Sequence, residues 1–497
     1  MKYEVGFDNE KYLKTQSEQI RKRIGQFGGK LYLEFGGKLF DDNHASRVLP
    51  GFEPDSKVKM LLTMKEQAEI VMVFNAGDME KNKVRGDLGI TYDLELLRLI
   101  DAFRDIGLYV GSVVLTQFDA HAAAATEFQK RLEGMGLKVY RHYSIPGYPY
   151  DVPAIVSPEG FGRNEYVETS RSLVVVTAPG PGSGKMATCL SQLYHDHQRG
   201  ISAGYAKFET FPVWNLPLKH PVNLAYEAAT TDLSDVNMID PFHLEAYGET
   251  AVNYNRDVEI YPLMRTIFER IFGSCPYKSP TDMGVNMAGS CIVDNDAVIH
   301  AANKEIVRRW YDAACAHRKG SIEKSTVLKN ESIMKQAGLT PENRKVACAA
   351  RAKSQETGEP AAAMELCDGS VITGRTSKLL GASSALLLNA LKTLAGIPDE
   401  IMLISPSVIE PVARLKVNLL GGNNPRLHTD EVLIALAVCA NTDEYAARAM
   451  AQLPNLKNTE VHSSVLLSQV DQNTFKKLGA NLTCDPVYQT KKLYHKG

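Results

Sequence analysis

Short apolar runs alternate with longer stretches of helical spacing over most of the chain. Runs of about four to eight apolar residues between turn residues predict buried strands, whereas apolar positions three or four apart predict helices. The predicted strands are 31–35, 69–74, 108–116, 137–142, 173–176 and part of 201–214; the predicted helices are 10–24, 54–67, 92–106, 121–134, 186–195 and 257–272. Because strands and helices alternate, we predict an α/β fold whose mainly parallel sheet is wound on both sides, as in P-loop and Rossmann proteins.

The last third of the chain repeats this alternation on a smaller scale. The pattern predicts strands at 371–373, 401–404 and 461–467 and helices at 379–394, 406–420, 430–439, 444–451 and 471–478. A long predicted helix, 294–317, ends at a Lys-Gly-Ser sequence, and we place a domain boundary shortly after it. We therefore expect a nucleotide- or phosphate-binding α/β region at 1–325 and a smaller C-terminal α/β domain at 326–497, which serves oligomerisation or substrate binding.

Ten of the sixteen residues of helix 379–394 are alanine or leucine. A helix that is apolar on every side is buried, either in the core of its own domain or against a partner subunit. From this helix we expect a homo-oligomer, because the two-fold axis is the commonest oligomer symmetry. Central burial within one domain is the alternative.

The composition gives no sign of a nucleic-acid-binding, secreted or membrane-spanning protein. The chain of 497 residues is 44% hydrophobic and 23% charged, and its net charge of −2 gives no reason to expect nucleic acid as the main partner. The N-terminus lacks the apolar core of a signal peptide, and no run of about 18 apolar residues predicts a membrane span. The eight cysteines are scattered without a C-x-x-C pair, so we expect buried free thiols and a cytoplasmic protein.

The most informative stretch is a glycine loop, residues 178–185, which reads Ala-Pro-Gly-Pro-Gly-Ser-Gly-Lys between a predicted strand and a predicted helix. Glycines let backbone N–H groups turn towards an anion, and the helix N-terminus adds its dipole. The expected phosphate-binding residues are Gly180, Gly182, Ser183, Gly184 and Lys185. The cofactor that this loop predicts is ATP or another nucleoside triphosphate, and Lys185 would hold its outer phosphates.

The loop departs from the usual G-x-x-x-x-G-K-[ST] pattern at two positions. Pro179 replaces the first glycine, and Met186 replaces the hydroxyl residue that ligates Mg²⁺. Thr188 is the nearest hydroxyl, about three residues further round the helix than Lys185, and we count it among the expected cofactor-binding residues. If Mg²⁺ is bound, carboxylates further along the chain must supply oxygen ligands. The candidates are Glu209 and Asp232 as metal ligands and Asp235 and Asp240, with Lys185, as catalytic residues.

Polar residues also follow the predicted strands before the glycine loop. They are Asn75, Asp78, Gln117 and Asp119. Ligands of open α/β sheets sit beyond the carboxyl ends of the strands, so we expect these residues on the same edge as the glycine loop.

Further segments carry a resemblance to a known family: residues 208–215, 225–230 and 240–243, together with the glycine loop and the Gly-Gly-Lys turns around 31–35. Over its whole length the chain resembles domain-of-unknown-function family 1846, a bacterial family. The resemblance implies an N-terminal region with a phosphate-binding loop and a separate C-terminal domain, but no established reaction. Some members carry the label of an ATP-dependent zinc protease, and the absence of H-E-x-x-H in this chain argues against that activity.

Two functions are compatible with these observations. The leading hypothesis is a P-loop NTPase or kinase-like enzyme that transfers or hydrolyses a phosphoryl group on a small cytosolic metabolite. The alternative is a regulatory protein that binds a nucleotide or phosphometabolite without turnover. Met186 favours the alternative, because it cannot ligate Mg²⁺.

Overall fold

The computed structural model describes residues 5–37, 39–40, 42–85, 89–119 and 123–489. The chain divides into two compact units. The N-terminal unit takes in residues 4–227 and 233–302, and the C-terminal unit takes in residues 303–497 with the short segments 1–3 and 228–232.

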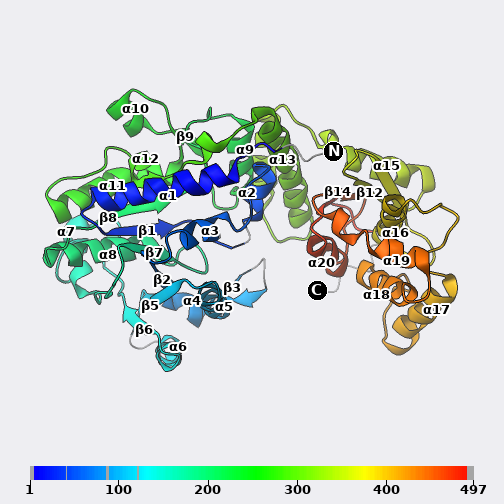
Figure 1. The fold of residues 1–497 in the computed structure, drawn as a ribbon, viewed down its shortest axis with the longest axis horizontal. Helices are drawn as coiled ribbons and strands as arrows, with labels where there is room; N and C mark the ends of the chain where they lie inside the picture. Colours follow the sequence, from blue (N-terminus) through cyan, green and yellow to red (C-terminus); the bar gives the residue numbers. More distant parts are fainter. Residues whose placement is uncertain (1–4, 38, 41, 86–88, 120–122, 490–497) are drawn as a thin grey trace. The chain divides into compact units, whose positions relative to one another are not determined.

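A seven-stranded sheet forms the centre of the N-terminal unit (Figure 1). The strand order is β11-β8-β1-β7-β2-β5-β6, and every pair is parallel. The bounds are β1 Leu31–Phe35, β2 Ala68–Asn75, β5 Tyr109–Thr116, β6 Lys138–Arg141, β7 Leu173–Thr177, β8 Gly204–Phe208 and β11 Gly284–Val285. β1 and β7 are buried at every position, as expected of central strands in a parallel sheet covered on both faces. The predicted α/β fold with a parallel sheet is confirmed.

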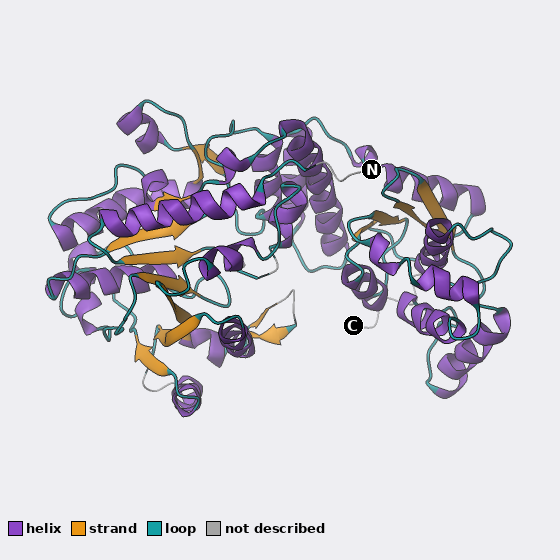
Figure 2. Ribbon diagram, in the orientation of Figure 1, coloured by secondary structure: helices purple, strands orange, loops and turns teal. Residues whose placement is uncertain are grey.

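Helices cover both faces of this sheet (Figure 2). The longer helices of the N-terminal unit are α1 Asn9–Gln26, α3 Ser56–Leu62, α5 Tyr92–Asp105, α6 Ala123–Gly134, α8 Lys185–Gln198 and α11 Asn255–Phe272. Its shorter helices, not all of which lie on the sheet, are α2 Asn43–Val48, α4 Ala76–Glu80, α7 Val152–Ile155, α9 Pro221–Ala229, α10 Pro241–Tyr247 and α12 Pro280–Met283. α13 Asn295–Arg318 begins in this unit, and its larger part belongs to the C-terminal unit. α8 contacts β1, β7 and β8 and packs on α11, and apolar side chains of α8, α11 and one face of the sheet share a core. The first two residues of the predicted helix 121–134 lie outside the described residues.

Two short antiparallel pairs complete the N-terminal unit. They are β3 Val84–Arg85 with β4 Ile90–Thr91, and β9 Asn237–Ile239 with β10 Val252–Tyr254.

The order of the strands creates a switch point between β1 and β7. These neighbours are paired in register, but the chain leaves them in opposite directions. From β1 it runs through α2 and α3 to β2, whereas from β7 it runs through α8 to β8, on the far side of β1. Connections that diverge from adjacent strands leave a crevice at the carboxyl edge, where ligands of such sheets bind.

The C-terminal unit contains a four-stranded mixed sheet in the order β13-β12-β14-β15. Its strands are β12 Ala361–Glu365, β13 Val371–Arg375, β14 Glu460–Ser463 and β15 Asn481–Cys484, and its helices are α14 Lys324–Gln336, α15 Lys345–Thr357, α16 Ala382–Ala395, α17 Pro406–Arg414, α18 Thr429–Cys439, α19 Glu444–Met450 and α20 Gln469–Lys477. The predicted second, smaller α/β domain is confirmed. The predicted strand 401–404 is wrong, because these residues form a loop whose apolar side chains pack into the core without a strand partner.

Two expectations about burial need correction. The leucines of α16 are covered inside the C-terminal unit, in a core shared with α18, α19 and β12, so this helix gives no support to an oligomer interface. All eight cysteines are free, but only three of them are buried. Cys348 and Cys367 are exposed, and the other three, Cys275, Cys315 and Cys439, are half-buried. Among the described residues, none of the helices has the length and apolar character needed to cross a bilayer.

Candidate functional site

The glycine loop follows β7 directly at the switch point, and α8 begins at its last residue. Two strand-end side chains hold the loop by its carbonyl groups. Asn75 Nδ2 at the end of β2 donates to the Gly182 carbonyl at 3.3 Å, and Thr116 Oγ1 at the end of β5 donates to the Ser183 carbonyl at 2.6 Å. The expectation that Asn75 lies at the same edge as the loop is confirmed.

The backbone amide groups of the loop, unlike its carbonyl groups, lack hydrogen-bond partners in the described part of the chain. No N–H of residues 182–187 donates a hydrogen bond to a described residue, and the N-terminus of α8 has no side-chain cap. Buried or half-buried amides are normally satisfied, and a glycine loop that leads into a helix presents such amides to anions. The hydrogen bonds to its carbonyl groups therefore hold the loop in place, and its backbone N–H groups stay available to bind an anion.

Lys185 is the first residue of α8 and is half-buried. Its ammonium group forms no ion pair or hydrogen bond with a described residue. Burial lowers the pKa of Lys185, and attraction to Glu34 offsets part of that effect. A lysine that is desolvated without a partner is a binding or catalytic candidate rather than a stabilising one.

A buried charge cluster lies on the sheet beside α8. The register places Glu34 of β1 directly opposite Lys207 of β8, and Tyr205 donates its hydroxyl proton to Glu34 Oε2 at 2.7 Å. Lys207 Nζ lies 3.0 Å from Glu209 Oε1 and also contacts Asp257 of α11. With Lys185, which is attracted to Glu34, the cluster contains two lysines, Lys185 and Lys207. Its three carboxylates are Glu34, Glu209 and Asp257, and it lies at the carboxyl edge of β1 and β8.

The surroundings shift the pKa values of Glu209 and Lys207 in this cluster. Burial and the neighbouring Asp257 raise the pKa of Glu209 to about 8, against the opposing effect of Lys207. Burial alone would lower the pKa of Lys207, but Asp257 and Glu209 raise it well above its ordinary value. Titratable groups whose environments push their pKa values apart are typical of acid–base sites.

Comparison with known proteins assigns the family. The model "Domain of unknown function DUF1846, N-terminal" matches residues 5–338, and "Domain of unknown function DUF1846, C-terminal" matches residues 342–494. The chain belongs to the DUF1846 family. A "UPF0371 protein" of Streptococcus sanguinis strain SK36 is 57% identical over 492 residues, which cover 99% of both chains. Another, of Streptococcus equi subsp. zooepidemicus strain MGCS10565, is 56% identical over 490 residues and also covers 99% of both. The predicted bacterial family and its full-length coverage are confirmed.

The predicted hydroxyl residues of this DUF1846 chain occupy different places. Ser183 lies in the loop, and its Oγ is buried without a hydrogen-bond partner among the described residues. Thr188 lies one turn into α8, fully buried, and its Oγ1 is likewise without a partner. Met186 packs against the apolar core. Ser183 is thus the hydroxyl placed within the loop itself.

None of the four predicted carboxylates, all of which the structure describes, forms a hydrogen bond or ion pair with a residue of the glycine loop. Asp240 caps α10: its Oδ1 accepts from two backbone amides of that helix, and its Oδ2 accepts from the amide and hydroxyl of Thr281. Asp235 is buried and pairs with Arg256 at 2.5 Å. Asp232 is exposed and belongs to the C-terminal unit. Glu209 contacts Lys207 within the buried charge cluster, and Asp235 lies close enough to interact electrostatically with Lys207 and Asp257.

A magnesium ion has limited protein ligands here. Among the residues that the structure describes, no group of three or more histidine, cysteine, aspartate or glutamate side chains is arranged so that it could hold a metal ion. The ammonium group of Lys207 already lies between Glu209 and Asp257. Magnesium is often held by one or two carboxylates plus the phosphates of the substrate, so Glu209 stays a predicted ligand rather than a demonstrated one.

Sequence reasoning missed Glu34, Lys207, Asp257 and Thr116. Glu34 and Lys207 each look like the exposed position of an alternating strand. Their burial follows from the central place of β1 and β8, which no local pattern shows. One local signal was present: Lys207 and Glu209 stand two apart at a strand end, which places both on one face of the sheet.

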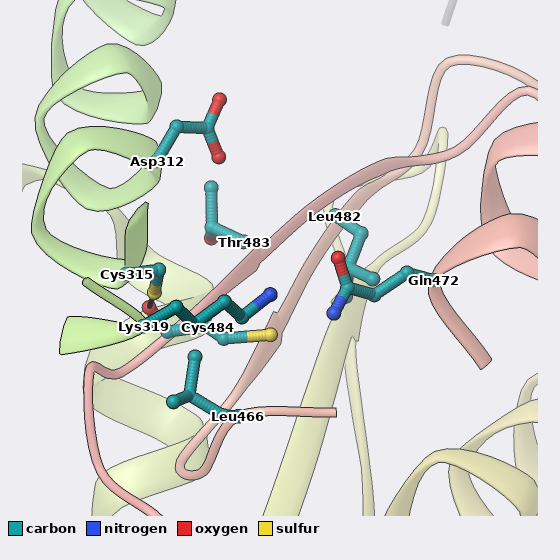
Figure 3. Close-up of a pocket in the computed structure, with 8 residues that line it drawn as sticks. All are labelled: Asp312, Cys315, Lys319, Leu466, Gln472, Leu482, Thr483 and Cys484. Carbon is teal, nitrogen blue, oxygen red and sulfur yellow. Dashed lines mark hydrogen bonds between the residues drawn. The ribbon is translucent and has the colours of Figure 1, made fainter. Parts of the chain in front are cut away.

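A small hollow in the C-terminal unit is a weaker candidate (Figure 3). Its volume is about 50 Å³, and Cys315 of α13 and Cys484 of β15 are among the residues that line it. Burial raises the pKa of Cys484 to about 12 and raises the pKa of Cys315 as well, so both thiols are protonated and unreactive near neutral pH. The space suits one or two water molecules rather than a metabolite.

Proposed function

We propose that this chain binds the phosphates of a nucleotide, ATP or a related triphosphate, at the glycine loop and transfers or hydrolyses a phosphoryl group on a small cytosolic metabolite. One observation carries the proposal. The loop at the switch point has its carbonyls bound by Asn75 and Thr116, while the amides of residues 182–187 and the ammonium of Lys185 have no partner among the described residues. That set of donors matches a phosphate chain.

The charge cluster supports a chemical step rather than binding alone. Phosphoryl transfer needs positive charge at the transferred group and a base for the attacking hydroxyl or water. Lys185 and Lys207 would supply the charge. Glu34, which accepts a single hydrogen bond from Tyr205 and lies near Lys185, is the best-placed general base. Glu209, protonated near neutral pH when its pKa is about 8, could act as an acid.

The test measures binding and turnover separately. Calorimetry with ATP, with and without Mg²⁺, should show saturable binding to the wild type, and ADP formation should rise when candidate metabolites are added, because both transfer to a metabolite and hydrolysis release ADP. Glu34→Gln should retain ATP affinity within a few fold and lose turnover by about 10²–10⁴-fold, the range for a positioned acid or base. Full turnover in Glu34→Gln would remove Glu34 as the base, and absence of ATP binding in the wild type would overturn the proposal.

One observation favours the second candidate function, a binding protein without turnover. Met186 packs into the core, and Thr188 is fully buried, so neither side chain is placed to ligate Mg²⁺. In that case ATP would bind with an affinity that Mg²⁺ does not change, and no product would form with any metabolite.

A further inference from the structure

The C-terminal unit contains a second cavity, of about 230 Å³, which is separate from the glycine loop. Its wall is formed by the end of β13, the start of α16, the segment before α18 and the segment before α20. These elements are far apart in sequence but lie in one unit (Figure 1). Typical pockets for drug-sized ligands are about 300–1,000 Å³, so this cavity suits a smaller molecule.

Two buried hydroxyl groups line the cavity without a partner. Thr376, just after β13, is 2% exposed, and Ser383, in the first turn of α16, is 3% exposed. Neither side chain forms a hydrogen bond with a described residue. The two hydroxyl oxygens are not sealed inside the protein, so on the cavity wall each is accessible and can donate to a ligand that enters the cavity.

The start of α16 adds backbone donors to the same wall. Gly381 is the N-cap and offers no side-chain cap, and the amides of residues 382–384 donate to no described residue. The first amides of a helix need acceptors from elsewhere, and the helix dipole favours a negative one. α16 has 14 residues, and Gly381, Ala382 and Ser383 all line the cavity.

Arg426 supplies positive charge beside these donors. Its Nε donates to the Ser377 carbonyl at 2.8 Å, and its two Nη groups have no partner among the described residues. The one carboxylate on the wall is already satisfied: Asp471 accepts from the amide and hydroxyl of Thr429 and from the Ser468 hydroxyl, and it pairs with His428. The cavity therefore presents unused donors, while its main acceptor is occupied.

We propose that this cavity is a binding site for a phosphate group, either inorganic phosphate or the phosphoryl end of a small phosphate ester. The ligand would accept from the amides at the start of α16, from Thr376 Oγ1 and Ser383 Oγ, and from the guanidinium of Arg426. A carboxylate offers two oxygens with about four acceptor positions, fewer than the available donors, whereas a phosphate group offers three strong acceptor oxygens.

The experiment uses the full chain with Lys185→Met as the common background, so that phosphate binding at the glycine loop is weakened throughout. Calorimetry with inorganic phosphate, and separately with glycerol phosphate, in chloride buffer gives the dissociation constants. Ser383→Ala and Arg426→Met should each weaken binding at least about tenfold, because each removes a hydrogen bond to a charged group.

Two variants provide matched controls. Thr393→Ala removes a hydroxyl at the other end of α16, where Oγ1 is bonded to the Asn389 carbonyl. Arg448→Met removes another arginine that donates to a backbone carbonyl in this unit. Both should bind phosphate like the background chain.

Tighter binding of glycerol phosphate would identify an ester as the ligand, and tighter binding of inorganic phosphate would identify the free ion. The proposal is overturned if the background chain binds neither probe saturably, or if Ser383→Ala binds like Thr393→Ala. Ser383→Ala decides the matter if Arg426→Met fails to fold, because removing an unpartnered hydroxyl leaves no lost hydrogen bond in the protein.

Discussion

Lys185→Met separates a ligand-binding lysine from a structural one. Methionine keeps most of the aliphatic length and removes the charge, so the packing at the start of α8 is preserved. If Lys185 holds an outer phosphate, ATP affinity should fall by about 1.5–3 kcal/mol, which corresponds to a factor of about 10–150 in the dissociation constant. Calorimetry measures this change directly.

The stability of the same variant should move in the other direction. Lys185 carries a partly desolvated charge without an ion-pair partner, so its removal should leave the melting temperature unchanged or raise it. The contrast is Lys207→Met, which leaves the carboxylate of Asp257 without its cation and Glu209 without its hydrogen-bond donor, and should cost about 3–5 kcal/mol. Calorimetric melting of the two variants gives the comparison.

The pH dependence of folding stability provides a third test of the role of Lys185. Its pKa is lowered in the folded state, so over the range between that pKa and the ordinary value of 10.5 the unfolded chain binds more protons. Stability contributed by this group therefore rises with pH through that range, and Lys185→Met should lose the rise. If Lys185→Met binds ATP like the wild type, or destabilises the chain as Lys207→Met does, the assignment of Lys185 is wrong.

Three further predictions concern the metal, the acid and the assembly. Met186→Thr restores the usual hydroxyl after the lysine, so Mg²⁺-dependent affinity or turnover should increase; an unchanged magnesium titration would place the metal elsewhere. Glu209 has a raised pKa, so its stabilising contribution is full below 4.5 and is lost as pH rises towards about 8; Glu209→Gln should flatten that part of the stability profile, and an identical profile would contradict the assignment. A homo-oligomer remains our proposal, and light scattering should give a mass well above the 54.8 kDa of one chain. Ile434 and Val438, one turn apart and both exposed on α18, are the side chains to replace with glutamate, and an unchanged assembly would exclude this face.

Local patterns predicted the glycine loop and its flanking elements correctly because the signals there are strong. A run of β-branched residues gives β7, and a stretch without glycine or proline gives α8. The same reasoning missed β12, whose sequence Ala-Ala-Ala-Met-Glu has low strand propensity although it is the second strand of its sheet. Its conformation comes from pairing with β13 and β14 on either side.

The charge cluster could not be predicted because it depends on register between distant strands. Glu34 meets Lys207 only because β8 pairs with β1 across more than half of the N-terminal unit's sequence.

Asp240 shows the opposite error, because it is predicted for the site but has a structural role. An aspartate before Pro-Phe-His has the sequence of a helix cap, and the structure uses it as one, so its proximity in sequence to other carboxylates carried no information about a site.

The glycines of the loop show how a sequence motif mixes packing with ligand binding. A Cβ at Gly180 would lie 2.7 Å from the Tyr92 hydroxyl oxygen, and one at Gly184, where φ is +89°, would lie 3.1 Å from Thr116. Both glycines are thus required by neighbouring side chains whether or not a phosphate binds. Gly182 differs, because φ is +74° but no atom lies within 4 Å of a Cβ placed there. Loss of ATP binding in Gly180→Ala would therefore report on the packing of α5 against the loop. Gly182→Ala strains the backbone because φ is positive, so its stability should fall by about 1 kcal/mol. A loss of ATP binding larger than this strain explains would report on the amides that face the ligand.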